Sequence, residues 1–528
     1  MEEEESYDST IYGERRSPTP RDNYDYEYSN PNNSEEEDEE ESSDNHRTKR
    51  RKHAPTLEDR ITTLPHSILL NILSFLPTKD AILTSVLSKR WAYLWTSVPS
   101  LSFTQSYKTA TAFASEVDDA LLLHRAPKLA NFSVQFEYKS HLKRHLDLWV
   151  RFATTAKVDK LSLQLSSPCF SLLDANEYRL PQYLYANEFV SEFDFSYCKI
   201  KPIGLLCWVS LKRLCIRKSA LCEDLIRKVL MGSPRLEYLE LNDCYEFNRL
   251  DIVSESLRKL VIDSYLVDML EREERALELE IVAPKIECLE ILGVFFMRRC
   301  RIKDVSALVE AKLDFNMWKG YDSDEEEGAC EEFQDTVRDI LESVHHVKKL
   351  TVGSWCLMVV SIMSMKRLPS PLSKCQCLTM KTSMEKENLP GIASLLQSSP
   401  YVETLNIDIT SSHYVGSMFL DIHCRHSYRD EVKHWKSREF YFKSLLVCLK
   451  TVKIFGFGER FFCTTEAFIL VVQFLLKNAM VLEKMVIIAS RDMQNQKRLV
   501  LPEFLQVTQK LLSFPRSSPH AVVLFPYL

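Results

Sequence analysis

The first folded part of this chain is decided by residues 64–77, which read LPHSILLNILSFLP, and by residues 86–91, which read VLSKRW. In the first run, Pro65 suits the first position of a helix, and Pro77 stops the helix. Apolar residues recur between the two prolines at the spacing of one helical stripe, at Ile68, Leu69, Ile72, Leu73, Phe75 and Leu76. The run therefore predicts one short amphipathic helix.

Two further short helices are predicted downstream. Thr78 is placed to cap the second helix, with Asp80 in its first turn, and Ser88 is placed to cap a third helix. The third helix would carry Trp91 and Trp95. Residues 57–98 thus form a three-helix unit with more apolar surface than so short a chain can bury, since domains below roughly 40 residues usually need a metal, disulfides or a partner. We expect another protein to cover part of it.

These motifs resemble the F-box in its plant form, over residues 58 to about 98, through DRITTLP at 59–65 and SVLSKRW at 85–91. The resemblance implies binding to a Skp-type adaptor, which links to a cullin scaffold. It also implies that nine residues divide between the adaptor interface and a small internal core: Leu64, Pro65, Ile68, Ile72, Leu76, Val86, Leu87, Trp91 and Trp95. The sequence leaves open which residue does which. The alternative is a plain helical hairpin that packs on the rest of the chain.

The N-terminal tail, residues 1–56, is predicted to be disordered. Acidic residues outnumber basic ones in it and branched apolar residues are few, so the tail buries too little surface to offset ordering entropy. An acidic block at 35–41 is followed by a basic cluster, Arg47, Lys49, Arg50, Arg51 and Lys52. This cluster is either a nuclear-import signal or a solvated charge run that neutralises the acidic block. We expect the protein in the nucleus, the cytoplasm or both.

A pattern of apolar, two polar, apolar, one polar, apolar returns many times between positions 99 and 433. Its central anchors include Phe132, Leu161, Phe193, Leu214, Leu239, Leu260, Leu289, Leu350 and Leu405. This recurrence is a loose leucine-rich-repeat signature. It predicts an α/β solenoid, with short parallel strands on the concave face and helices on the convex face. A globular α/β domain with chance spacing is the alternative.

Three helices between the strands are predicted at residues 223–231, 333–346 and 392–397. Residues 321–328 read YDSDEEEG and predict an exposed acidic loop. The histidines at 413, 423, 426 and 434, with Cys424, fit no standard zinc spacing and are interpreted as loop residues.

The C-terminal block alternates strand and helix again, with strands at 448–455 and 481–487 around a helix at 466–479. Residues 434–500 resemble the FBD region of plant F-box proteins, through LKTVKI at 449–454, LLKNA at 475–479 and LEKM at 482–485. The chain departs from that pattern by inserting FFC at 461–463. The region adds no chemistry, and we expect it to cap the solenoid; residues 501–528 form a C-terminal segment.

The sequence shows no motif for catalysis, metal binding or membrane insertion. Only 11 of 528 residues are glycine, and no phosphate-binding, zinc-protease or nucleophile-elbow motif occurs. Scattered cysteines such as Cys198, Cys215, Cys244 and Cys288 are interpreted as buried thiols, and the pair Cys375 and Cys377 lacks a second pair. No apolar run is long enough to span a bilayer, and the part after the tail is nearly neutral. We therefore expect a soluble intracellular protein that is not an enzyme and has no cofactor, metal, membrane or nucleic-acid partner.

The resemblance implies the substrate-recognition subunit of a cullin-based, SCF-type ubiquitin ligase. The F-box would bind the Skp-type adaptor, and the repeats would bind a target protein that the sequence does not identify. One alternative is an interaction scaffold that works without a ligase. Another is a small-molecule receptor, as in plant hormone co-receptors of similar build, but those need a basic pocket for a polyphosphate, and no basic cluster across the repeats would serve.

Overall fold

The structure is a computed structural model that describes residues 61, 63–106, 108–167, 177–265, 278–297, 299–317, 326–363, 372, 374–410, 447–457, 465–489 and 501–526. Residues 61–528 form one unit and are treated by themselves. The predicted tail with its basic cluster, the acidic run 321–325 and the histidine-rich run 413–434 lie outside the described residues.

The N-terminal helical segment contains α1 (His66–Leu73), α2 (Thr78–Leu83) and two 3₁₀ turns, η1 (Thr84–Val86) and η2 (Leu94–Ser97). Pro65 precedes α1 as its cap residue instead of being its first residue. The predicted third helix is present only as η2, which carries Trp95, whereas Trp91 lies in the turns formed by residues 89–93. Helix formation alone contributes little stability to so short a segment. We attribute the course of its backbone to the burial of Trp91 and Trp95.

The predicted capping role of Thr78 is also wrong. Thr78 is the first residue of α2, and its buried hydroxyl accepts a hydrogen bond of 2.8 Å from the backbone N–H of Ser102. Ser102 lies in β1 (Ser100–Thr104), the first strand of the repeats. The N–H of Arg125 also donates to the carbonyl of Thr96 at 2.7 Å. Hydrogen bonds therefore join the helical segment directly to the first repeat.

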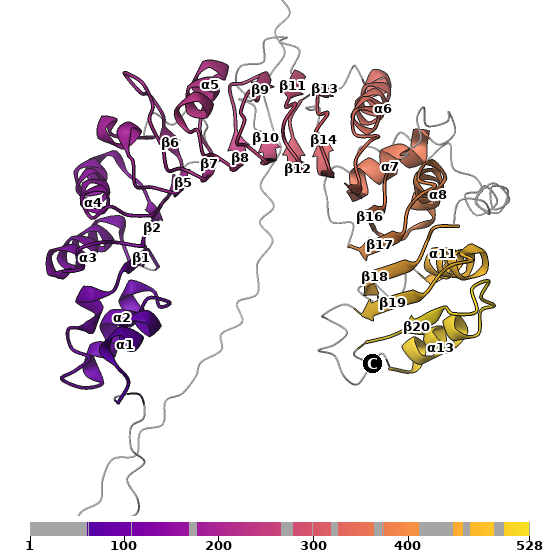
Figure 1. Ribbon diagram of the computed structural model, residues 1–528, viewed down its shortest axis with the longest axis horizontal. Coiled ribbons are helices and arrows are strands. Elements are labelled where there is room, and N and C mark those ends of the chain that lie inside the picture. Colours follow the sequence, from indigo (N-terminus) through magenta and orange to yellow (C-terminus); the bar gives the residue numbers. More distant parts are fainter. Residues whose placement is uncertain are drawn as a thin grey trace, which may run out of the picture. The chain divides into compact units, whose positions relative to one another are not determined.

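The main sheet contains 15 strands in the described residues, and each pairs with its neighbour in parallel. The strands lie side by side along the inner side of the repeat array (Figure 1). After β1 they are β2 (Asn131–Glu137), β3 (Lys160–Ser166), β5 (Glu192–Ser196), β7 (Arg213–Arg217), β8 (Tyr238–Cys244), β10 (Lys259–Tyr265), β12 (Cys288–Phe295), β14 (Glu310–Met317), β15 (Lys349–Val352), β16 (Cys377–Thr382), β17 (Thr404–Ile409), β18 (Thr451–Phe457), β19 (Lys484–Ala489) and β20 (Val522–Leu524).

Helices cover the outer side of most of the sheet (Figure 1). They are α3 (Ala110–Leu123), α4 (Lys143–Thr155), α5 (Glu223–Gly232), α6 (Glu326–Ser343), α7 (Ser354–Met363), α8 (Leu389–Ser398), α11 (Thr465–Asn478) and α13 (Leu501–Leu512). Helix α6 begins at Glu326, so the last three residues of the predicted acidic loop are helical. The predicted helix at 333–346 corresponds to the later part of α6, and the other three predicted helices correspond to α5, α8 and α11.

The middle repeats differ from the predicted helical convex face. Their outer layer is a second parallel sheet, in the order β13 (Arg299–Lys303), β11 (Glu278–Val282) and β9 (Arg249–Asp251). In β11, for example, Leu279 and Ile281 are buried and alternate with glutamates. This period of two suits a strand and not a helix. A two-stranded sheet, β4 (Tyr178–Arg179) with β6 (Cys198–Lys199), occupies the outer side of an earlier repeat.

The predicted anchor residues confirm the repeat register. Phe132, Leu161, Phe193, Leu214, Leu239, Leu260 and Leu289 pair in succession across their strands, and all are buried. Leu350 and Leu405 occupy the same row further along. Four strands that the sequence did not predict complete the sheet: β1, β14, β16 and β20. Strands β18 and β19 continue the same sheet, whereas their assignment to an FBD region stays a prediction.

Candidate functional site

A stripe of exposed apolar side chains marks the helical segment. Phe75 is 79% exposed and Val86 is 85% exposed. Ile68, Ile72 and Phe75 follow one another at helical spacing along one face of α1 and just beyond its end. We define the apolar helical surface as six exposed residues from α1, α2 and η1 and the residues that follow them: Ile68, Ile72, Phe75, Leu83, Val86 and Leu87.

A small core supports the apolar helical surface from below. Leu69 and Leu73, on another face of α1, are fully buried. Trp91 and Trp95 are 5% and 6% exposed and join the same core. The Arg90 guanidinium donates to the carbonyl of Leu64, which ties the end of the segment to its beginning. The exposed stripe is therefore held on a packed base and is not a frayed helix.

The structure divides the nine residues predicted for the adaptor interface and the core. Pro65, Ile68, Ile72, Val86 and Leu87 are exposed, and Leu64 and Leu76 are half-buried against the core. Trp91 and Trp95 are buried, so of the two alternatives left open the structure places them in the core. Sequence reasoning did not include Phe75 and Leu83 among the contact candidates, although the spacing of Phe75 after Ile68 and Ile72 carries the signal.

The second candidate surface is the inner face of the sheet, where charged side chains of neighbouring repeats pair with one another. Arg217 on β7 lies between Asp194 on β5 and Glu240 on β8, and pairs with both. Glu290 on β12 pairs with Lys259 on β10, and with Lys312 on β14 at 3.5 Å. We define the charged ladder as Asp194, Arg213, Arg217, Glu240, Lys259, Glu290 and Lys312.

Tyr238 adds an aromatic contact to the charged ladder. The guanidinium of Arg213 stacks over the Tyr238 ring at 3.5 Å, and the Lys259 ammonium lies 5.7 Å from the same ring. The Tyr238 hydroxyl donates to Glu240 at 2.8 Å. Burial, together with this hydrogen bond to Glu240, raises the pKa of Tyr238 to about 12. The centre of the inner face therefore holds its charges already satisfied within the chain.

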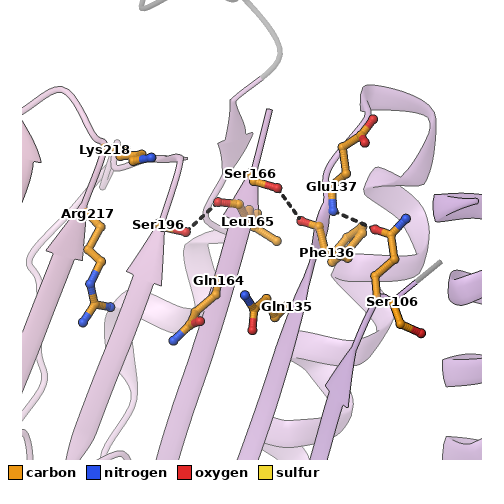
Figure 2. A pocket seen from close by; sticks show the side chains of 11 residues that line it. Ser106, Gln135, Phe136, Glu137, Gln164, Leu165, Ser166, Ser196, Arg217 and Lys218 are labelled. Atoms are coloured by element: carbon orange, nitrogen blue, oxygen red, sulfur yellow. Dashed lines mark hydrogen bonds between the residues drawn. The ribbon is translucent and has the colours of Figure 1, made fainter. Parts of the chain in front are cut away.

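The inner face changes character toward the N-terminal repeats. Several of its outward positions there are neutral hydroxyls and carboxamides, such as Ser133, Ser162, Gln135 and Gln164. A pocket of about 470 Å³ lies at the carboxyl ends of these strands (Figure 2). This polar pocket is lined by Gln105, Ser106, Gln135, Phe136, Glu137, Gln164, Leu165, Ser166, Ser196, Arg217 and Lys218.

Hydrogen bonds fix several walls of the polar pocket (Figure 2). The Ser196 hydroxyl donates to the backbone carbonyl of Leu165 at 2.6 Å, and the side-chain Oε1 of Gln105 accepts from the backbone N–H of Glu137 at 2.9 Å. Gln164 donates to Asp194 at 3.3 Å, which links the pocket to the charged ladder. The pocket thus has a rigid frame with polar groups at its rim.

Comparisons with known proteins cover the two regions that carry these surfaces. Residues 61–103 match the F-box domain model, and residues 123–510 match the model described as "At1g61320/AtMIF1, LRR domain". The chain belongs to the F-box/LRR-repeat proteins. It is 30% identical to F-box/LRR-repeat protein At5g02910 of Arabidopsis thaliana over 81% of this chain and 88% of that protein. It is 32% identical to F-box/LRR-repeat protein At3g03360 of the same plant, over 68% and 71% of the two chains.

Several thiols of this F-box/LRR-repeat protein are buried and have raised pKa values. Burial raises the pKa of Cys244 and of Cys300 to about 12, and burial with the nearby Glu240 does the same for Cys215. Cys198 is buried as expected, whereas Cys288 is only half-buried. The described residues contain no cluster of His, Cys, Asp and Glu that could hold a metal ion. Cys375 and Cys377 make local contacts instead, since the Cys375 thiol reaches the Cys377 carbonyl at 3.5 Å.

Helices of sufficient length and apolar character to cross a membrane are absent from the described part of this F-box/LRR-repeat protein. The two prominent surfaces that it does present are both suited to binding proteins. One is apolar and helical, and the other is a wide polar sheet face with a pocket.

Proposed function

We propose that this F-box/LRR-repeat protein is the substrate-recognition subunit of an SCF-type ubiquitin ligase. The apolar helical surface would bind a Skp-type adaptor, and the adaptor would link the chain to a cullin. The inner face of the repeats would bind a target protein. The chain itself would catalyse nothing, and would act by raising the effective concentration of the target near the transfer machinery.

One observation carries the adaptor proposal, namely the exposed stripe on a packed base. Six large apolar side chains stand in solvent although a buried core lies directly beneath them. Exposed apolar clusters of this kind mark interaction sites on soluble proteins. Helix-presented residues at i, i+4 and i+7 are the usual anchors when a helix binds a groove.

Adaptor binding is tested by charging this stripe. We expect the double variant Ile68→Asp with Val86→Asp to lose co-purification with a co-expressed Skp-type adaptor, because both side chains are exposed and neither supports the core. Leu122→Asp on α3 is the matched control, since Leu122 is 83% exposed but lies outside the F-box. Adaptor binding that survives the double variant would refute the assignment.

A scaffold that works without a ligase is the second candidate. Capture of a cullin together with the adaptor separates the two, because a scaffold of this kind would not recruit the cullin. Affinity purification under proteasome inhibition should then enrich the target, whose identity the chain does not reveal.

Nuclear or cytoplasmic location belongs to the same proposal. We expect a fluorescent fusion of the full chain to leave the nucleus when Arg50, Arg51 and Lys52 are replaced by alanine. Unchanged distribution would assign the basic cluster to charge neutralisation within the tail.

A further inference from the structure

We propose that the polar pocket holds an extended segment of the target, with neutral polar residues along its length and a carboxylate at the end that faces Lys218. This inference rests on the proposed function, because it names the part of the repeat array that takes the target. Strand geometry, the groups left available in the pocket and the backbone at Lys218 support it.

The pocket is the width of five strands. Gln135 pairs with Gln164 across β2 and β3, and Ser196 and Arg217 continue the same row on β5 and β7. Neighbouring strands lie about 4.8 Å apart, so the four steps from β1 to β7 span about 19 Å. An extended chain advances about 3.3 Å per residue, so about six residues would cross the pocket at right angles to the strands.

Two carboxamides are available to such a segment. In the part of the chain that the structure describes, the Gln135 side chain has no hydrogen-bond partner, and Gln164 uses only its amino group, toward Asp194. By contrast, Gln105 is occupied at both ends, since it also donates to the Lys108 carbonyl at 2.7 Å. A free carboxamide offers both a donor and an acceptor, which matches peptide N–H and C=O groups and polar side chains.

Among the described residues that line the pocket, Lys218 is the one charged side chain without an ion pair. Arg217 is held by Asp194 and Glu240, and Glu137 pairs with Lys139 at 3.0 Å. Lys218 has no ion pair within 4.0 Å among the described residues, although its charge influences Asp243 in the next repeat. One carboxylate would therefore complement the pocket, whereas a polyphosphate would leave most of its charge unpaired.

The backbone at Lys218 supports a role for its side chain. Lys218 has a φ of +47°, and the equivalent residues of neighbouring repeats, Tyr197, Asp243, Ser264 and Gly293, also have positive φ. Glycine or asparagine adopts this left-handed conformation at lower cost than lysine. Because the conformation recurs in these repeats, it belongs to the turn. The turn itself does not require a lysine, so we assign the lysine to binding.

The lining also distinguishes a peptide from a small hydrophobic ligand. Small-molecule sites occupy about 300–1,000 Å³ and are lined mainly by apolar and aromatic side chains. This pocket has a fitting volume of about 470 Å³, but its rim is built from glutamine, serine, glutamate and lysine. A polar segment of a protein suits that rim better than an apolar metabolite.

The test uses the full chain co-purified with its adaptor and libraries of acetylated, amidated hexapeptides. Each library contains Ser, Asn, Gln and Gly, with Asp fixed at one position in turn, and a matched set carries Lys instead. We expect tightest binding when Asp is fixed at one end, and about tenfold weaker binding for Lys at that end. Free-acid peptides without Asp distinguish a terminal carboxylate from a side-chain carboxylate, and tight binding of either supports the pocket.

Lys218→Asn is the decisive variant, because asparagine suits the left-handed backbone while it removes the cation. We expect it to lose the Asp preference about tenfold. The double variant Gln135→Ala with Gln164→Ala should weaken binding of all libraries. Lys453→Asn, at an exposed inner-face position of β18, is the matched control and should leave the preference intact.

An Asp preference that is absent from the wild type, or that persists in Lys218→Asn, would overturn the inference. Adaptor co-purification is measured on the same preparations. Failure of the wild type to co-purify with the adaptor would refute the proposed function, whereas normal co-purification without a peptide preference would refute only the pocket assignment.

Discussion

The apolar helical surface and the charged ladder differ in how many of their side chains already have partners within the chain. Ile68, Phe75 and Val86 are exposed. In the ladder, Arg217 and Glu290 each have two partners of opposite charge from neighbouring repeats. A partner that covers the first surface gains free energy from every apolar side chain it buries, at roughly 25 cal/mol per Å².

A partner that docks on the ladder must instead replace ion pairs that exist before it arrives. Such exchange yields specificity more than affinity, because a mismatched partner leaves charges unpaired. The apolar helical surface therefore suits one constant, tightly bound partner. The inner face of the repeats suits a partner that is selected by its charges. Variants on either side can break this distinction, and their expected effects decrease from the core tryptophan to the carboxylates of the inner face.

Truncation of the tryptophan beneath the apolar helical surface should have the largest effect. Trp91 is 5% exposed, and Trp91→Ala removes a buried aromatic from a small core, so we expect a loss of about 3–5 kcal/mol in unfolding free energy. Urea unfolding followed by circular dichroism measures it. Tyr93→Ala, in the same segment but exposed, is the control and should change stability by at most about 0.5 kcal/mol. An unchanged midpoint for Trp91→Ala would contradict the packed base.

Truncation of an exposed residue should separate binding from stability. We expect Phe75→Ala to weaken adaptor binding by about 2 kcal/mol, roughly 30-fold, as for an aromatic hot spot. Because Phe75 is exposed, the unfolding free energy of this variant should stay within about 0.5 kcal/mol of the wild type. Titration calorimetry with the adaptor measures the first quantity. A large loss of stability with intact binding would invert the roles assigned to Phe75 and Trp91.

The sequence predicted the repeat strands well because their signal is local. Each anchor pair, such as Leu161 and Leu163, sits inside one short run, and burial on one face sets the register. Strand β14 escaped prediction because its first anchor is the small residue Ala311. Strand β1 escaped because its run begins at Val98, where the helical motif ends.

The functional surfaces were less predictable because they depend on contacts between distant residues. Asp194 and Arg217 belong to different repeats and meet only through the pairing of β5 with β7. Likewise, the stripe of residues 68–76 did not reveal which face would pack inward, since both faces of α1 are apolar. The fold supplied that answer by burying Leu69 and Leu73.

Removal of the central cation of the charged ladder should have an intermediate effect. Arg217→Met leaves Asp194 and Glu240 without their shared partner, and Glu240 is largely buried, so we expect a loss of about 1–2 kcal/mol. Lys160→Met is the control, because its ion pair with Glu192 is exposed and should contribute less than about 0.5 kcal/mol. Urea unfolding of both variants measures the difference. Equal losses would show that the ladder is no better satisfied than an ordinary surface pair.

Two carboxylates of the inner face should change the unfolding free energy with pH in opposite directions. This is the smallest of the expected effects. Burial, with a smaller contribution from Glu240, raises the pKa of Asp263 above its usual 3.8. The folded state therefore binds that proton more tightly than the unfolded state. The resulting stability is fully present below pH 3.8 and is lost as the pH rises through the folded pKa.

Glu290 behaves in the opposite way. Burial acts to raise its pKa, but the hydrogen bonds and charges of Lys259 and Lys312 outweigh burial, so the pKa lies below its usual 4.5. The stability that this carboxylate contributes is present above pH 4.5 and is lost as the pH falls through the folded pKa.

Isosteric amides should separate these two contributions. Asp263→Asn keeps an acceptor for the Asn242 amide, which lies 3.2 Å away, and should reduce the fall in unfolding free energy as the pH rises above 3.8. Glu290→Gln should reduce the fall on the acid side instead. Each change should stay below about 1 kcal/mol, because both side chains are partly solvated. Urea midpoints measured from about pH 3 to about pH 7 provide the check. Identical pH dependence of the unfolding free energy in the two variants would mean that burial and ion pairing affect these carboxylates in the same way. The distinction between the charged ladder and the apolar helical surface would then be lost.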